Sequence, residues 1–237
     1  MGGSETLRKG TVKVTASLSN APSVLLATAS SGGTIASVRF LGRNGFKVGV
    51  LSSQRLGAAA WSNCAARAYR APPESESQHF IERLLAIGAS NPGQILLPTS
   101  DETVWLYTLN ANELQRYFRI ALPSLPVLLN ILDKKRFADA VVRAGLGVLP
   151  SWDPGTIDEV VALAPTLPYP ILIKPRTHVH RLRNDKGIVV YSASELKNKY
   201  EQYIDREQAA AGGDSGLREA SRPVSYTHLT LPTILRV

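Results

Sequence analysis

The chain has 237 residues, 44% of them hydrophobic, with a formal net charge of +8 and a single cysteine, Cys64. This hydrophobic content excludes wholesale disorder, and no window approaches the roughly 18 consecutive apolar residues that a membrane span needs. One cysteine excludes a disulfide framework or a thiolate metal site and fits a reducing compartment, so we expect a cytoplasmic protein with no membrane partner.

The positive charge suits an anionic partner, but its distribution argues against nucleic acid. Basic residues are scattered, with local clusters only at residues 134–136 and 174–186, and aromatic residues are not interleaved with them. A nucleic-acid stacking platform needs aromatic side chains beside a basic groove, so we predict no nucleic-acid partner. Residues 1–21 hold basic residues but no apolar segment and no cleavage signal, which predicts a disordered leader.

Apolar runs of strand length alternate with stretches of helical spacing along residues 22–126, which predicts an open α/β sheet of the dinucleotide-fold type. The first two strands and the helix between them form a βαβ unit that should be parallel. Strands are expected at residues 23–28, 47–52 and 94–98, helices at 34–42, 78–87 and 101–109, and a strand or connector at 120–126.

The pattern changes at residue 127, where we expect an α+β lobe to begin. Apolar residues keep helical spacing as far as Gly145, which predicts one continuous helix over residues 127–144. Composition after residue 204 becomes linker-like, over residues 205–223. The other expected elements are strands at 148–152, 168–175 and 187–191, the last two as a hairpin, and helices at 156–164 and 194–204.

A glycine turn connects the first strand to the first helix. Backbone N–H groups of such a turn can hold an anion at the helix N-terminus, which makes it a candidate substrate contact. The turn lacks the G-x-G-x-x-G spacing of dinucleotide-binding proteins, and a tight strand-to-helix connection alone also explains it. The residues of this turn are Ser30, Ser31, Gly32 and Gly33.

A second polar segment, Ser100, Asp101 and Glu102, follows the strand expected at residues 94–98. Ligands of open α/β sheets bind at the carboxyl ends of strands, so these residues are further candidates for substrate contact. Helix capping by Ser100, with two acids in the first helical turn, explains the same residues, and both interpretations stay open.

Two lysines are placed where an anion would be needed. Lys174 ends the apolar strand 171–174, so its stem is expected to be buried while its ammonium group meets a phosphate or carboxylate. Lys134 lies in the helix expected at 127–144. A solvated lysine on that helix and a strand-end lysine that reaches solvent are the alternative interpretations.

The order of three motifs resembles the ATP-grasp superfamily. D-K-x-x-F begins at Asp133, A-G-L-G-V-L-P begins at Ala144, and Y-P-I-L-I-K-P begins at Tyr169. The resemblance covers residues 22–204 and is greatest to predicted carboxylate–amine ligases and the carbamoyl-phosphate-synthase-like group. It implies a Rossmann-like pre-ATP-grasp domain at 22–126, followed by an incomplete α+β ATP-grasp lobe at 127–204.

The same resemblance implies ATP as cofactor, with Lys134 and Lys174 on its phosphates and with Lys186 and Gly187 closing a phosphate loop. The family's loop is glycine-rich, whereas residues 176–186 contain no glycine. This departure argues against tight binding of ATP by the loop. Mg²⁺ is implied too, with its ligands expected in a C-terminal part beyond this chain. We therefore predict no metal ligands here and assign no catalytic residue.

The resemblance implies that the intact parent uses ATP to convert a carboxylate substrate into an acyl phosphate, which an amine then attacks. Alternatives are a non-catalytic nucleotide-binding protein or a dinucleotide-binding Rossmann domain. The missing G-x-G-x-x-G and the absence of an acid after the second strand, at Leu51-Ser52-Ser53, weigh against the last alternative. The oligomeric state is not determined by the sequence, and a homo-oligomer is compatible with it.

Residues 224–237 resemble the conceptual translation of a transposase-based sequencing adapter. We expect a non-native tail there and exclude it from fold reasoning. Because the Mg²⁺ ligands are expected beyond this chain, we also predict that the chain has no turnover of its own. A native β-type tail is the alternative interpretation, because threonine, tyrosine and leucine suit a strand.

Overall fold

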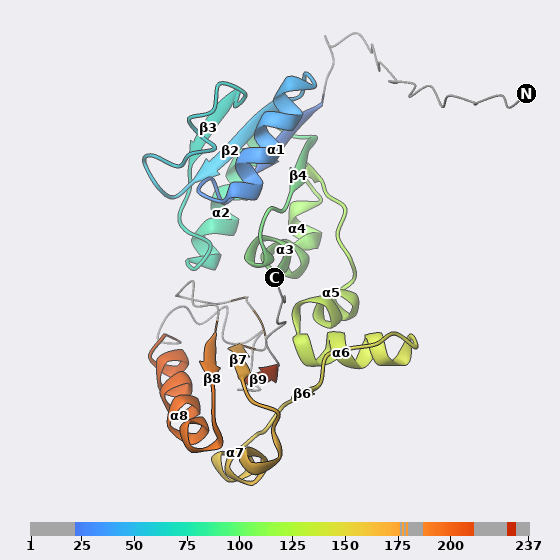
Figure 1. The fold of residues 1–237 in the computed structure, drawn as a ribbon. Helices are drawn as coiled ribbons and strands as arrows, with labels where there is room; N and C mark the ends of the chain where they lie inside the picture. The colour runs from blue at the N-terminus through green and yellow to red at the C-terminus, as the bar shows by residue number, and fades with distance from the viewer. Residues whose placement is uncertain (1–21, 176, 178, 180–186, 211–226, 231–237) are drawn as a thin grey trace, which may run out of the picture.

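The computed structural model describes residues 22–175, 177, 179, 187–210 and 227–230 and contains two sheets (Figure 1). The first has five strands in the order β3-β2-β1-β4-β5, and all of its pairings are parallel. The α/β class expected from the sequence is confirmed. The strands are β1 Ser23–Leu26, β2 Lys47–Ser52, β3 Arg67–Arg70, β4 Gln94–Leu97 and β5 Phe118–Arg119.

Helices cover both faces of this sheet because β1 is apolar on both sides. Side chains of a strand alternate between faces, so Leu25 joins the core that contains Phe80 of α2, while Val24 and Leu26 join the core that contains Val38 of α1. A strand buried on both faces is typical of parallel sheets. The helices are α1 Gly32–Arg43, α2 Ser77–Ser90, α3 Asp101–Leu109 and α4 Ala111–Leu114.

The second sheet is antiparallel, with the order β6-β9-β7-β8. Its core combines Ile171 and Ile173 of β7 with Leu196 and Tyr200 of α8. Tyr200 also donates a hydrogen bond of 3.1 Å to the carbonyl of Pro154. The elements are β6 Ser151–Trp152, α7 Ile157–Leu163, η2 Ala164–Thr166, β7 Ile171–Pro175, β8 Ile188–Val190, α8 Ala193–Ala210 and β9 Thr227–Thr230.

The single helix expected at 127–144 is wrong, because two helices, α5 Leu125–Leu132 and α6 Lys134–Arg143, occupy this region. They are separated by Asp133, whose backbone is extended and whose carboxylate accepts a hydrogen bond of 3.0 Å from the N–H of Arg136. An aspartate in this position is a favourable N-cap. The correction places Lys134 at the first position of a helix instead of in its middle.

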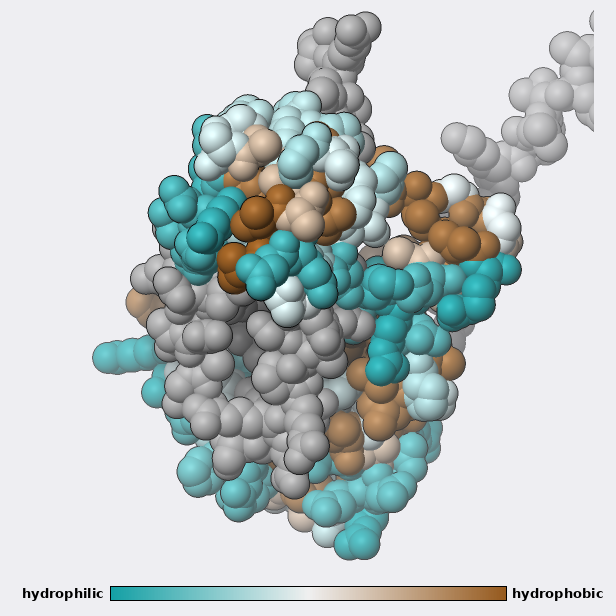
Figure 2. Space-filling view, turned by 90° about the horizontal axis from the view of Figure 1, so that it is seen from below, coloured by the Kyte–Doolittle hydropathy of each residue, from teal (hydrophilic) through white to brown (hydrophobic). Residues whose placement is uncertain are grey.

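Helix α6 is amphipathic, and none of its residues is buried. Phe137 and Val142 are 52% and 56% exposed, and Leu146 just beyond the helix is 63% exposed. Figure 2 shows hydrophobic side chains on the surface at the side of the molecule where α6 lies. The apolar stripe of α6 is therefore not covered by the part of the chain that the structure describes.

Several boundaries differ from those expected. Strands β3 and β5 and helix α4 were not expected, and only Ser151–Trp152 of the segment 148–152 is a strand. Of the two alternatives for residues 120–126, the connector is the one found, at residues 120–124. Helix α8 continues to Ala210, beyond the end expected at residue 204. Strand β9 lies within the adapter-like segment 224–237 and pairs with β6 and β7, and the non-native origin of that segment stays a prediction.

The two sheets are connected through a small apolar cluster. Trp105 of α3 and Leu128 of α5 pack together with Val179, which follows β7 in the chain. All three side chains are buried. None of the helices in the described residues is long and apolar enough to cross a membrane.

Candidate functional site

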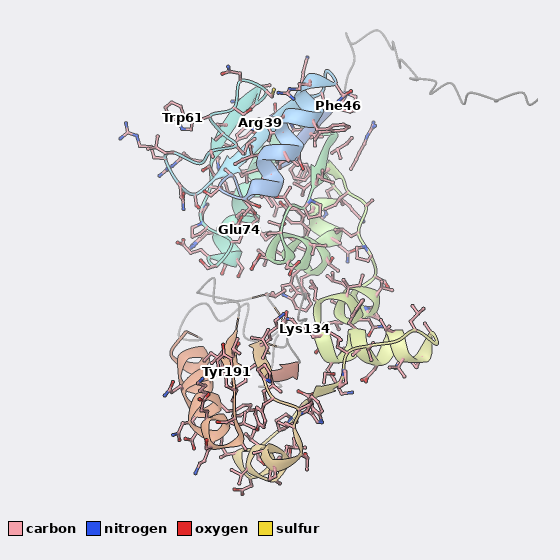
Figure 3. The ribbon with its side chains drawn as sticks, viewed as in Figure 1. Arg39, Phe46, Trp61, Glu74, Lys134 and Tyr191 are labelled. Atoms are coloured by element: carbon pink, nitrogen blue, oxygen red, sulfur yellow. The ribbon has the colours of Figure 1, made fainter. Side chains whose placement is uncertain are left out.

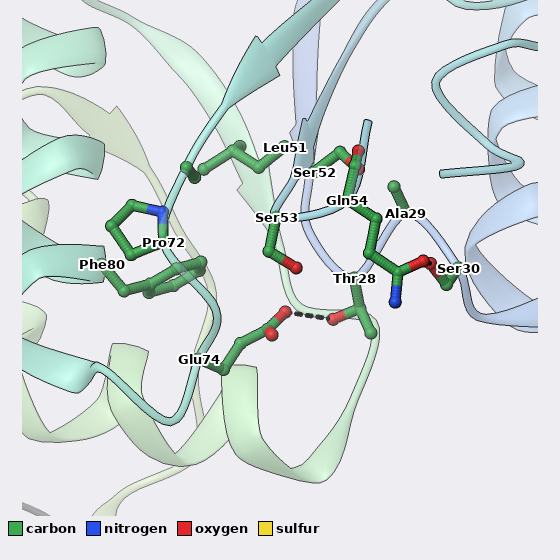
Figure 4. Close-up of a pocket in the computed structure, with 11 residues that line it drawn as sticks. Thr28, Ala29, Ser30, Leu51, Ser52, Ser53, Gln54, Pro72, Glu74 and Phe80 are labelled. Atoms are coloured by element: carbon green, nitrogen blue, oxygen red, sulfur yellow. Dashed lines mark hydrogen bonds between the residues drawn. The ribbon is translucent and has the colours of Figure 1, made fainter. Parts of the chain in front are cut away.

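A cavity of about 140 Å³ lies where β1, β2 and β3 end at the carboxyl edge of the first sheet (Figure 4). Its walls are built by the segments that follow these three strands, and its only charged lining residue is Glu74. Ligands of open α/β sheets bind at this edge. The lining residues are Thr28, Ala29, Ser30, Leu51, Ser52, Ser53, Gln54, Ala71, Pro72, Glu74 and Phe80.

Thr28 has a strained backbone at the end of β1. Its φ of 55° is positive, and no other non-glycine residue among the described ones has a positive φ. A β-branched residue in this region is costly, because its side chain crowds the backbone. The conformation directs the Thr28 hydroxyl to Glu74, whose Oε1 accepts its hydrogen bond at 2.8 Å. Strain of this kind is often found at functional sites.

The segment after β2 is held against the segment after β1. Ser30 Oγ donates to Gln54 Oε1 at 2.9 Å, and Ser52 Oγ donates to the backbone carbonyl of Gln54 at 2.7 Å. In Figure 4 the hydroxyl of Ser53 points toward the Glu74 carboxylate. The polar side of the cavity is thus built from hydroxyl, amide and carboxylate groups.

The predicted glycine turn begins α1 at the same edge. Ser31 is the N-cap residue, without a side-chain capping hydrogen bond. A Cβ added at Gly32 would meet nothing within 4 Å, and one at Gly33 would meet only Ser31 Oγ at 3.7 Å, so packing against the described residues does not require either glycine. Neither has a positive φ. An anion contact at Ser30, Ser31, Gly32 and Gly33 stays a prediction.

Ser100 caps α3, as one of its two interpretations predicted. Its Oγ accepts a hydrogen bond from the Thr103 N–H at 3.1 Å, and Thr103 Oγ1 accepts one from the Ser100 N–H at 3.0 Å. This reciprocal pair is a capping box. The hydroxyl of Thr28 is also 3.4 Å from Ser100 Oγ, so the cap adjoins the cavity.

Acidic and phenolic groups surround the Thr28–Glu74 pair. Burial raises the pKa of Glu102, and the charges of Asp101 and Glu74 raise it further, against hydrogen bonds from the backbone and Ser100. Burial and the Glu74 carboxylate also raise the pKa of Tyr107, whose side chain is fully buried. Its hydroxyl has no hydrogen-bond partner. Asp101 is exposed.

Sequence reasoning missed Glu74, Thr28 and Gln54. Glu74 follows β3 in the chain. Strand β3 has charged and exposed residues, so the sequence pattern did not indicate a strand there. Once β3 is known, the rule that ligand residues follow parallel strands identifies Glu74 without further information.

In the second half of the chain, Lys134 is the first residue of α6, next to the capping residue Asp133. Figure 3 shows its side chain pointing from the start of α6 toward the side of the molecule that holds β7. The neighbouring Lys135 forms an ion pair with Asp139 of the same helix.

Lys174 lies on β7, directly after the buried Ile173, and is itself half-buried, as expected for a strand-end lysine. Gly187 precedes β8 with a φ of +118°, and a Cβ there would collide with the carbonyl oxygen of Ile173. The hairpin itself therefore requires glycine at position 187, independently of any contact with ATP. Lys186 lies outside the described residues.

The donor chemistry of this half fits a nucleotide. Ammonium groups on Lys134 and Lys174 are suitable partners for phosphate oxygens, and Lys134 adds its charge to the positive end of a helix. The described residues contain no group of three or more histidine, cysteine, aspartate or glutamate side chains that could hold a metal ion. Whether these two lysines contact ATP stays a prediction.

No protein-family profile and no curated protein sequence matches the chain. Solved structures do match. A biotin carboxylase from Campylobacter jejuni, bound to an ATP ligand, has a TM-score of 0.61 and 16% identity over 87% of this chain and 44% of its own. An L-amino acid ligase from Bacillus licheniformis has a TM-score of 0.57 and 15% identity over 90% of this chain and 44% of its own. The chain has the ATP-grasp fold.

A third match, an N5-carboxyaminoimidazole synthetase from Staphylococcus aureus, gives a TM-score of 0.56 and 13% identity over 88% of this chain and 46% of its own. The chain thus spans less than half the length of these ATP-grasp proteins. The resemblance that the motifs at Asp133, Ala144 and Tyr169 indicated is confirmed at the level of the fold.

Proposed function

We propose that the intact protein is an ATP-dependent carboxylate–amine ligase, which activates a carboxylate as an acyl phosphate for attack by an amine. The ATP-grasp fold, with Lys134 at the start of α6 and Lys174 on β7, is the observation that carries this proposal. We further propose that the parallel sheet with its helices is the Rossmann-like pre-ATP-grasp domain and that residues 127–204 are part of the ATP-grasp lobe.

The two lysines have an electrostatic role in this proposal. Phosphoryl transfer depends almost entirely on positioning and on stabilising charge as it moves between oxygens. Bound ATP would supply the phosphoryl group, and Mg²⁺ would neutralise part of its charge. Lys134 and Lys174 would bind phosphate oxygens, and Gly187 would hold the end of the loop between β7 and β8 close to Lys174.

The substrate would bind at the carboxyl edge of the first sheet. Two predicted segments meet there, the turn before α1 and the cap of α3, and the cavity lies beside both. The N-terminal amides of α1 suit a carboxylate, because the helix dipole favours negative charge. Contacts would come from Ser30, Ser31, Gly32, Gly33, Ser100, Asp101 and Glu102.

Calorimetric titration with ATP tests the nucleotide part of the proposal. We expect Lys134→Ala and Lys174→Ala each to weaken ATP binding about tenfold or more, as for loss of a charge-assisted hydrogen bond. Lys135→Ala is the matched control, because Lys135 is the neighbouring lysine of the same helix and matches no nucleotide-binding position of the family's motif, and it should change affinity little. Equal effects of Lys134→Ala and Lys135→Ala would contradict the assignment.

Turnover separates the ligase from a protein that only binds nucleotide. We expect this chain to bind ATP without releasing ADP, and the full-length parent to release ADP when carboxylate and amine are supplied. ADP release by this chain that depends on Lys134 would show that Mg²⁺ ligands outside it are not needed. A full-length parent that binds ATP and turns over no carboxylate would replace the ligase by a nucleotide-binding protein.

A further inference from the structure

The cavity at the ends of β1, β2 and β3 has one charged group and no counter-charge. Glu74 is half-buried, and neither lysine nor arginine lines the cavity. Its carboxylate accepts a hydrogen bond from Thr28 at 2.8 Å, which leaves the carboxylate with capacity for further donors, since an ionised carboxylate has about four acceptor positions. A half-buried acceptor without a cationic partner favours a ligand that supplies one.

The surroundings of Glu74 strengthen the preference for positive charge. The pKa of Glu102 is raised by burial and then by Asp101 and Glu74, which shows that the acidic side chains are close enough to interact. Tyr107 is fully buried, its hydroxyl has no partner, and it interacts electrostatically with the same Glu74 carboxylate. A cationic group beside the Glu74 carboxylate would be attracted to it, whereas an anionic group in the same position would be repelled.

The lining selects an organic cation over a metal ion. In Figure 4, Leu51, Pro72 and Phe80 form an apolar wall opposite the polar side chains of Thr28, Ser30 and Gln54. Ala71 also lines the cavity. Hydrated Mg²⁺ and Ca²⁺ require several oxygen ligands in a defined arrangement, and the described residues hold no suitable group of acids. An ammonium group on a carbon skeleton fits both walls, because it donates hydrogen bonds on one side and packs methylene groups on the other.

The hydrogen-bond donors of an ammonium group match the acceptors on the polar side. Such a group carries three N–H donors, and the Glu74 carboxylate and the Ser53 hydroxyl face each other across the cavity in Figure 4. The Thr28 hydroxyl, which already donates to Glu74, can accept through its lone pairs. The cavity, of about 140 Å³, is large enough for a small amine-bearing group.

We propose that this cavity binds the protonated amine of a substrate, with Glu74 as its charged partner and Thr28 and Ser53 as additional hydrogen-bonding groups. The proposal rests on the ligase function above, and it adds that one of the two substrates is a cationic amine held by the first domain. Glu74 is therefore a residue that determines specificity, whereas Lys134 and Lys174 bind nucleotide.

The test uses two probes that differ in charge. L-alaninamide is cationic below about pH 7, as expected for an α-amino group, and N-acetyl-L-alaninamide is its neutral counterpart. Titration of the 237-residue chain at pH 6.5, followed by ¹H–¹⁵N NMR, should shift the amide signals of Thr28, Ser53 and Glu74 with L-alaninamide only. Equal binding of both probes, or no shift at these residues, would overturn the proposal.

Three variants locate the binding. Glu74→Gln keeps an acceptor for Thr28 but removes the charge, so it should weaken L-alaninamide binding about tenfold or more, equivalent to about 1.4 kcal/mol. Glu76→Gln changes a nearby exposed acid outside the cavity lining and should leave binding unchanged. Glu74→Asp retains the charge at a shorter reach, and an intermediate loss is expected, which keeps the test valid if Glu74→Gln does not fold.

ATP titration of the same samples separates this inference from the proposed function. ATP binding that depends on Lys134, without amine binding at Glu74, would refute the cavity assignment and leave the ligase proposal in place. Amine binding at Glu74, without ATP binding that depends on Lys134, would support the cavity and refute the ligase proposal.

Discussion

Gly187 occupies a position where the hairpin of β7 and β8 requires glycine. A non-glycine residue at its positive φ is strained, and a Cβ would also collide with the Ile173 carbonyl. We expect Gly187→Ala to lower the free energy of unfolding by about 2–4 kcal/mol, from strain and overpacking together. Chemical denaturation measures this loss.

Gly93 provides the control for that substitution. Its φ is also positive, at +85°, but a Cβ would meet nothing within 4 Å. Gly93→Ala should therefore cost only the backbone strain, about 1–2 kcal/mol. If Gly187→Ala cost no more than Gly93→Ala, the collision with the Ile173 carbonyl would not constrain the hairpin. The shape of the hairpin would then not explain the glycine at position 187.

Glu102 gives the site a dependence on pH. Its pKa in the folded protein is raised above the ordinary 4.5, mainly by burial, so folding favours its protonated form. Stability from this group is fully present below pH 4.5 and is lost as pH rises through the raised pKa. We expect Glu102→Gln to melt at a higher temperature than the wild type at pH 7, with the difference shrinking as pH falls below 4.5.

Thermal unfolding between pH 4 and pH 7 provides the measurement for Glu102. Exposed Glu113 is a suitable control, and Glu113→Gln should not reproduce the gain at pH 7. A Glu102→Gln protein that is less stable than the wild type at pH 7 would mean that the hydrogen bonds to Ser100 and the backbone outweigh burial.

The candidate site was only partly predictable at this scale. Ser30 and Ser100 were found because each follows an apolar run that reads clearly as a strand, and parallel strands end at one edge. Glu74 and Gln54 lie in loops, where no periodicity indicates which residues come together. The strain at Thr28 is a property of the folded backbone and leaves no sequence signal.

Among the elements, α3 depends on its cap. Ser100 and Thr103 satisfy each other's backbone N–H groups, whereas Ser124, the N-cap of α5, makes no side-chain capping hydrogen bond. We expect Ser100→Ala to reduce the free energy of unfolding by about 1 kcal/mol. Ser124→Ala should have a much smaller effect in the same denaturation experiment, and equal effects would argue against the capping box.

Elements with strong apolar patterns were predicted, and elements defined by long-range pairing were not. Strands β1, β2 and β4 are buried on the sheet, so their sequences are continuous apolar runs. Strand β3 is at the edge and carries two arginines, and β5 has only two residues, so both exist through pairing with a neighbour. The break at Asp133 was missed because one extended residue hardly disturbs helical spacing.

For the whole molecule, the contact between Trp105, Leu128 and Val179 joins two separate cores. The first sheet and the second sheet each have their own buried clusters, and this cluster contains residues from both halves of the described chain. Leu128 is 2% exposed, so its truncation leaves a hole at the junction without touching either sheet's core. We expect such a junction to make the two halves unfold together.

Leu128→Ala should therefore uncouple the two halves. Truncating a buried leucine typically lowers the free energy of unfolding by about 2–5 kcal/mol. Because the lost contacts join the two halves, we expect calorimetry to show two unfolding transitions in place of one. Val127→Ala, at a 49% exposed position of the same helix, should leave the calorimetric trace unchanged. One transition that only moves to lower temperature in Leu128→Ala would show that the halves are coupled elsewhere.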